Sequence, residues 1–174
     1  ETPYEDNGVQ KVEPITNWQA LRLSHDLGAR SSFGMMATFK EPSPNLNDQI
    51  GTLIPRYASK NFNRVVGFDL NLASRKTNHR MQATYAKSFT DTVTTADQDW
   101  TLKISQRWQN KWLQYGLSFL DIGDDFYSQT GFVSENGLQR IGFETTGNTF
   151  IRRFGIRRIN GGIRTNYITK KSTD

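Results

Sequence analysis

The chain has 174 residues and a net charge of +5, with 35% hydrophobic and 12% aromatic residues. Its apolar fraction is low for a large soluble core, where about 45–50% is usual, yet its aromatic content is too high for a disordered chain. The absence of cysteine excludes disulfide scaffolds and thiolate metal sites. The basic residues are dispersed along the chain, which argues against nucleic acid as the partner.

No stretch approaches the ~20 consecutive apolar residues that a membrane helix needs. Low hydrophobicity combined with many aromatic residues instead suits β-strands that are apolar on one face only. The chain begins at Glu1, without an initiator methionine or a signal peptide, so we expect a processed protein or a fragment. The length suffices for one domain, a barrel or barrel segment over 1–174.

Apolar and polar residues alternate with a period of two, which predicts strands with one apolar face. The eight predicted strands lie near 15–27, 32–40, 61–73, 79–89, 99–108, 112–121, 137–146 and 156–169. Their lengths suit membrane strands, which need about 9–11 residues, better than globular strands, which average about 5–6.

The face assignment is clear in all but the first predicted strand, where Leu21 and Leu23 compete with Trp18 and Ala20. The second strand places on one face Phe33, Met35, Ala37 and Phe39. In the later strands the apolar face includes Phe62, Val66, Phe68, Leu70, Leu72, Met81, Tyr85, Phe89, Trp100, Leu102, Ile104, Trp108, Leu113, Tyr115, Leu117, Phe119, Ile141, Phe143, Ile159, Ile163 and Tyr167.

The opposite face carries the charged residues Asp69, Lys103, Arg107, Arg140, Glu144 and Arg164. These groups could line a pore, where an excess of Arg and Lys would favour anions. In a narrow barrel the same groups would pair and plug the interior.

Links between the predicted strands alternate in length. Short links at 28–31, 74–78 and 109–111 alternate with long links at 41–60, 90–98 and 122–136, and the last link, near 147–155, is intermediate. Short periplasmic turns and longer extracellular loops alternate in this way in outer-membrane barrels.

Two basic residues, Arg64 and Lys87, interrupt the apolar face next to long links. If Leu72 pairs with His79 across the short turn, Arg64 lies opposite Lys87. Like charges directly opposite are destabilising, unless an anion such as a lipopolysaccharide phosphate lies between them. The alternative interpretation is that two long side chains extend separately to water.

Clustered carboxylates at Asp121, Asp124 and Asp125 are candidates for calcium binding, although their spacing does not match an EF-hand. A solvated or Arg-paired loop is the alternative. The adjacent Ser24, His25 and Asp26 cannot converge as a catalytic triad, because neighbouring strand residues point to opposite faces. We therefore predict no catalytic residues and no cofactor.

A family resemblance is carried by the strands that flank three segments and by these segments themselves: 16–34 (TNWQALRLSHDLGARSSFG), 61–69 (NFNRVVGFD) and 121–133 (DIGDDFYSQTGFV). They resemble the uncharacterised C-terminal barrel domain of Bacteroidota-type outer-membrane proteins, which usually follows a family-nine-type carbohydrate-binding module. The strongest motif is Asp-x-x-x-x-Phe followed by Gly-Phe-Val, and the likeness spans most of 15–169. It implies an outer-membrane location and a role in glycan handling or transport, and carries over no catalytic residues.

The chain departs from that family, because it lacks the carbohydrate-binding module, is shorter than the family barrels and ends without an aromatic residue. These departures suggest a piece of a larger barrel. We therefore predict an all-β, antiparallel up-and-down transmembrane barrel that acts as a pore, an anchor or a component of an envelope assembly. Its partners would be outer-membrane lipid or lipopolysaccharide and other envelope proteins. The alternatives are a soluble carbohydrate-binding β-sandwich and an outer-membrane hydrolase with a loop-borne site.

Overall fold

The structure is a computed structural model that describes residues 4–6, 9–11, 16–42, 62–90, 98–129, 135–151 and 158–171. The first two strands, β1 (Tyr4–Asp6) and β2 (Val9–Lys11), pair as a small antiparallel sheet of their own. This hairpin was not predicted from the sequence. No helix in the described ranges is long and apolar enough to cross a membrane.

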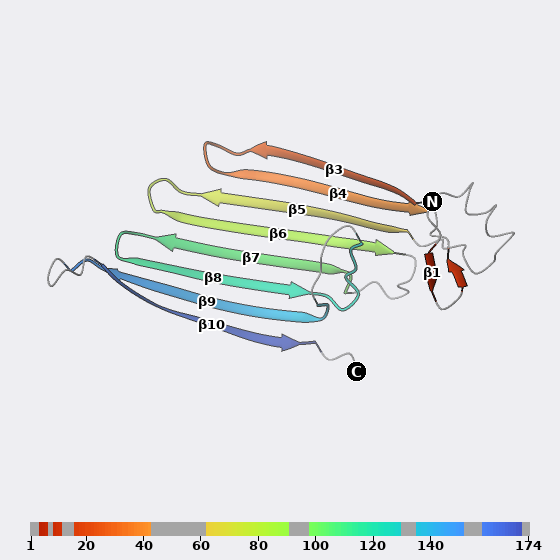
Figure 1. Ribbon diagram of the computed structural model, residues 1–174. Coiled ribbons are helices and arrows are strands. Elements are labelled where there is room, and N and C mark those ends of the chain that lie inside the picture. The colour runs from red at the N-terminus through yellow and green to blue at the C-terminus, as the bar shows by residue number, and fades with distance from the viewer. Residues whose placement is uncertain are drawn as a thin grey trace.

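The other eight strands form one antiparallel sheet in which each strand pairs with its neighbours in the chain (Figure 1). These strands are β3 (Thr16–Asp26), β4 (Ser32–Pro42), β5 (Asn63–Ala73), β6 (His79–Thr90), β7 (Trp100–Gln109), β8 (Leu113–Ile122), β9 (Leu138–Thr149) and β10 (Ile159–Lys170). All eight coincide with the strands predicted from the alternation of apolar and polar residues. The up-and-down antiparallel order is therefore confirmed.

Register across the sheet shows which side chains share a face. In β3 the ambiguity is resolved, because Leu21 pairs with Ala37 and Leu23 with Met35, on the apolar side. Trp18 therefore lies on the opposite side. We call the side that carries Phe68 and Leu117 the apolar face, and the side that carries Asp69 and Glu144 the polar face.

The antiparallel order places alternate strand ends at two opposite ends of the sheet (Figure 1). The tight turns 27–31, 74–78 and 110–112 lie at one of these ends, which we call the short-turn edge. The strands β4, β6 and β8 end at the opposite side, which we call the long-loop edge. The three short links predicted from the sequence thus all lie at the same end of the strands.

The turn after β5 corrects the predicted register. Leu72 pairs with Met81 rather than with His79, and Arg64 pairs with Phe89 rather than with Lys87. The turn is tighter than expected because the Ser74 amide donates to the His79 carbonyl, and Asn78 takes a left-handed conformation (φ 53°). The shift of two residues preserves the face of every side chain but removes the juxtaposition of Arg64 and Lys87.

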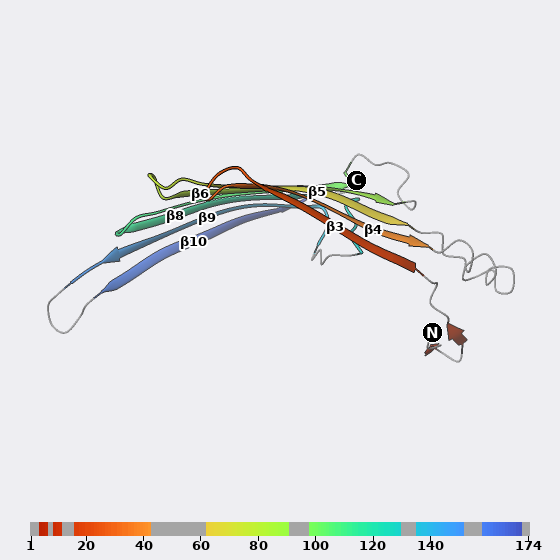
Figure 2. The same ribbon diagram turned by 90° about the horizontal axis from the view of Figure 1, so that it is seen from above.

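The sheet is bowed, and the segment that follows β8 lies on its concave side (Figure 2). In this segment Phe126 packs with Val65 and Ile122, and this small cluster is the hydrophobic core of the described residues. Val65 and Ile122 belong to the polar face, so the polar face is the concave one. The apolar face is therefore convex.

The strands are staggered in one direction across the sheet. Asp26, the last residue of β3, is connected through the paired residues of each strand to Asn166 of β10. Asn166 lies seven residues beyond Ile159, where β10 begins. Without a stagger, Asp26 would align with Ile159. A sheet needs such a shear to close into a barrel.

The sheet is open, since β3 and β10 are its two outermost strands and are not paired with each other. A closed barrel, which the sequence pattern predicted, is therefore not present in the described residues. Within these ranges the eight strands lie in one sheet, and no second sheet packs face to face with it.

Candidate functional site

The apolar face exposes large hydrophobic side chains along most of the sheet. Phe68, Phe143 and Leu117 are 41%, 40% and 47% exposed. The exposed members of this face are Leu21, Leu23, Phe33, Phe68, Leu72, Met81, Tyr85, Phe89, Leu113, Leu117, Ile141, Phe143, Ile159, Ile163 and Tyr167. No described element covers them, and a continuous exposed apolar surface of this extent marks an interaction site.

Aromatic side chains concentrate at both ends of the strands on this face. Near the short-turn edge Trp108 stacks on Tyr115 at 5.5 Å and lies 6.3 Å from His79. Eight residues further back along β7, Trp100 stacks on Tyr85 at 6.4 Å. At ~3.4 Å per residue the two tryptophans are about 27 Å apart along the strand.

Cationic side chains sit over aromatic rings at the same two edges. At the short-turn edge Lys111 lies over Trp112 and Phe150, at 5.1 and 5.5 Å from the ring centroids. At the long-loop edge Arg64 lies over Phe62 and Lys171 over Trp100, at 4.8 and 5.1 Å. An apolar band between two belts of aromatic and cationic side chains can contact lipid tails along its middle and lipid headgroups at its two borders.

Charged strand residues on the apolar face all lie within three residues of the long-loop edge. They are Glu41, Arg64, Lys87 and Asp121. Each has a partner of opposite charge, because Arg64 pairs with Glu41, Lys87 with Asp99 and Asp121 with Lys171. The candidate lipopolysaccharide contacts Arg64 and Lys87 therefore each bind a carboxylate, and neither extends alone to water.

Removing the Lys87 side chain should destabilise the protein, because Asp99 is buried and Lys87 Nζ lies 3.3 Å from its Oδ1. Because Lys87 itself is partly exposed, we expect Lys87→Ala to lower the free energy of unfolding by about 1–2 kcal/mol, measured by urea titration in detergent. The double variant Lys87→Ala with Asp99→Asn should recover part of the loss. Equal stability of Lys87→Ala and the wild type would contradict this role for the ion pair.

The three candidate calcium ligands do not converge. Asp121 points to the apolar face, where it pairs with Lys171 and accepts a hydrogen bond from Gln139. Asp124 and Asp125 belong to the turn after β8, where the Asp125 amide donates to the Gln98 carbonyl. No group of three metal-ligating side chains occurs in the described ranges. Likewise, His25 lies on the apolar face while Ser24 and Asp26 lie on the polar face.

Two of the carboxylates on the polar face each reach an arginine across a glycine on the strand between them. Asp69 of β5 passes over Gly34 of β4 to Arg22 of β3, at 2.9 Å. A Cβ at Gly34 would lie 2.6 Å from Asp69 Oδ1. The absence of a side chain at this glycine therefore makes room for the ion pair.

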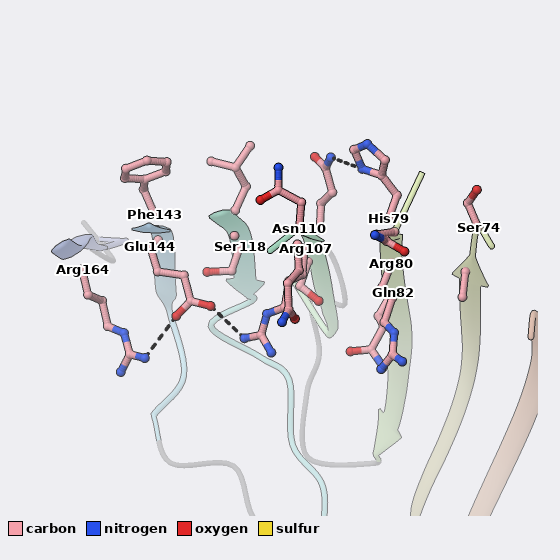
Figure 3. Close-up of a pocket in the computed structure, with 18 of the residues that line it drawn as sticks. Ser74, His79, Arg80, Gln82, Arg107, Asn110, Ser118, Phe143, Glu144 and Arg164 are labelled. Carbon is pink, nitrogen blue, oxygen red and sulfur yellow. Dashed lines mark hydrogen bonds and ion pairs between the residues drawn. The ribbon is translucent and has the colours of Figure 1, made fainter. Parts of the chain in front are cut away.

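The second carboxylate repeats this arrangement on later strands. Glu144 of β9 crosses Gly116 of β8 to reach Arg107 of β7, at 2.7 Å, and also binds Arg164 of β10, at 3.1 Å. Figure 3 shows these side chains on the face opposite to Phe143. Glu144 and its two arginine partners border a hollow of about 1000 Å³ near the short-turn edge. This hollow is also lined by Arg80, Gln82, Ser105 and Asn110.

At the long-loop edge the polar face is partly covered by the segment 123–129. Two buried polar side chains hold it: the Asn63 side chain donates to the Tyr127 carbonyl and accepts from the Gln129 amide, while Ser88 Oγ accepts from the Tyr127 amide. Phe126 lies underneath, against the sheet. The Asp and Phe of the motif identified in the sequence are thus an ion-pair partner and a packing residue; the Gly-Phe-Val part lies outside the described residues.

Sequence reasoning missed Asn63, Ser88 and Phe126 as anchors of this segment. The one signal was the aromatic pair Phe126 and Tyr127, which follows two aspartates in the loop after β8. Comparison with protein-family models, curated proteins and solved structures finds no match to this chain.

Proposed function

We propose that this chain forms wall strands of a bacterial outer-membrane β-barrel, with its apolar face against lipid and its polar face toward the interior. In this role it acts as a pore, an anchor or a component of an envelope assembly, without enzymatic activity. The observation that carries the proposal is the exposed, convex apolar face, bordered at both strand ends by aromatic and cationic side chains. A water-soluble sheet would have to cover such a surface.

The dimensions of the band support a membrane as its environment. With strands tilted by about 40°, the distance between Trp100 and Trp108 crosses roughly 20 Å of hydrocarbon, and the belt side chains extend it at each end. An unpaired Arg or Lys in the middle of this band would cost about 2–4 kcal/mol. The charged strand residues of this face instead lie near the long-loop edge, in ion pairs.

The two outermost strands, each unpaired on one side, also favour a barrel. In hydrocarbon an unpaired strand edge leaves backbone N–H and C=O groups without partners, at several kcal/mol each. β3 and β10 therefore need either each other or additional strands, and the stagger across the sheet is of the kind that closure requires. The family resemblance adds a role in glycan handling or transport to this proposal.

The proposal predicts behaviour typical of outer-membrane barrels. Expressed with a signal sequence in a Gram-negative host, the protein should fractionate with the outer membrane and require detergent for extraction. On a denaturing gel the unheated sample should migrate differently from the boiled one, because a closed barrel resists unfolding by the detergent. Release into the buffer-soluble fraction, with one gel position before and after boiling, would rule out the proposal.

A further inference from the structure

Charge on the polar face is strongly unbalanced. Strand residues on this face include eight basic side chains, Arg22, Lys40, Arg80, Lys103, Arg107, Arg140, Arg164 and Lys170, and three acidic side chains, Asp26, Asp69 and Glu144. The face therefore carries five more positive than negative charges. A concave surface of one sign concentrates ions of the opposite sign.

The ion pairs on this face do not use all of its cations. Asp69 is bound by Arg22, and Glu144 is shared by Arg107 and Arg164. Among the described residues no carboxylate forms an ion pair with Arg80, Lys103 or Arg140. Arg80 is the second residue of β6, at its short-turn end, whereas Lys103 and Arg140 lie three and two residues from the long-loop ends of β7 and β9.

The arrangement of these cations itself favours an anion. Arg80 lies directly opposite Arg107 in the β6–β7 ladder, and Lys103 and Arg140 flank Leu120 in a row across β7, β8 and β9. Like charges on directly opposed residues destabilise a sheet unless an anion lies between them. Arg80 and Arg107 both border the hollow in Figure 3, and the next pair on the same face of these strands, Gln82 and Ser105, supplies further hydrogen-bonding groups.

From this placement we infer that the polar face is the anion-binding wall of an open pore, which passes small anions in preference to cations. The inference rests on the proposed function, because it needs the polar face to enclose water. Glu144 has the opposite effect to the free cations, since it neutralises part of the charge of Arg107 and Arg164. The sign of each charge change therefore predicts the direction of the change in selectivity.

Reversal potentials in planar lipid bilayers under a potassium chloride gradient test this. The wild-type protein should prefer chloride to potassium by at least about twofold. Arg80→Gln with Lys103→Gln should move the ratio toward one, while Glu144→Gln should raise it. The matched control, Arg75→Gln with Lys76→Gln, removes one arginine and one lysine from the exposed turn 74–78 and should leave the ratio near its wild-type value.

Several results would overturn the inference. A preference for potassium in the wild type, or equal shifts in the test and control variants, would show that the polar face does not select anions. A protein that shows the heat-dependent gel shift but conducts no current would be a closed barrel, so the pore would fail while the proposed function stands. A protein that shows neither the gel shift nor a current would contradict both the pore and the proposed function. Each variant is scored only where its gel shift equals that of the wild type.

Discussion

Replacing Ala83 by arginine is expected to abolish assembly of the protein into membranes. Ala83 lies in the interior of β6 on the apolar face, between Leu70 and Ile104 on the neighbouring strands. Since the substitution removes only a methyl group, its cost comes from placing a guanidinium group in hydrocarbon, about 2–4 kcal/mol for a lipid-facing cation near the midplane. The measurement is the fraction of protein with the heat-dependent gel shift after refolding into phospholipid vesicles.

The neighbouring residue provides a matched control. Thr84 occupies the next position of the same strand on the polar face, opposite Asp69. Thr84→Arg introduces the same charge on the polar face, which the proposed barrel would turn toward water, and should refold close to the wild-type fraction. If the apolar face were in contact with water, both substitutions would be tolerated, and Ala83→Arg would even improve solubility. Equal refolding of the two variants would therefore exclude a lipid-facing role for this face.

Much of the fold could be predicted because a strand encodes its faces locally. Side chains alternate between faces with a period of two, so Phe68 and Asp69 were assigned to opposite sides without any tertiary information. In β3 this rule was insufficient, because Trp18 and Leu21 are both apolar and lie on opposite faces. Only pairing with β4 assigned Leu21 to the apolar side.

The register error has a different physical origin. Alternation fixes which face a residue occupies but not its partner, because a shift of two residues preserves every face. The partner depends on the turn, and here Asn78 and the hydrogen bond from Ser74 to His79 make that turn tighter than the sequence suggested. The predicted contact between Arg64 and Lys87 depended on register, and it was therefore wrong although both residues were placed on the correct face.

The polar contacts of the candidate site could not be predicted because they join distant strands. Glu144 reaches Arg107 only because Gly116, on the strand between them, has no side chain. In the sequence Gly116 is one glycine among 14, and nothing local relates it to a carboxylate 28 positions later. The excess of basic residues on the polar face, in contrast, was visible in the sequence, because it follows from alternation alone.

A glycine at the end of β8 should be the position most sensitive to an added methyl group. A Cβ on Gly123 would lie 1.9 Å from the Gln98 carbonyl oxygen, and this neighbour is backbone that cannot rotate away. The Gly123 amide also donates to the Trp100 carbonyl, and its own carbonyl accepts from Phe126 and Gly137. Gly123→Ala must therefore displace the start of the segment that covers the polar face.

We expect Gly123→Ala to lower the free energy of unfolding by about 2–4 kcal/mol, and to make the segment 123–129 more accessible to protease in the refolded protein. Gly161→Ala is the matched control, because a Cβ on Gly161 meets nothing within 4 Å. It should leave both the urea midpoint and the protease pattern close to those of the wild type. Similar stability of the two variants would mean that the close approach of Gly123 to Gln98 does not hold the segment on the polar face. If the interior is an open pore, Gly123→Ala should also increase its conductance, because Phe126 leaves the concave side when the segment 123–129 is released.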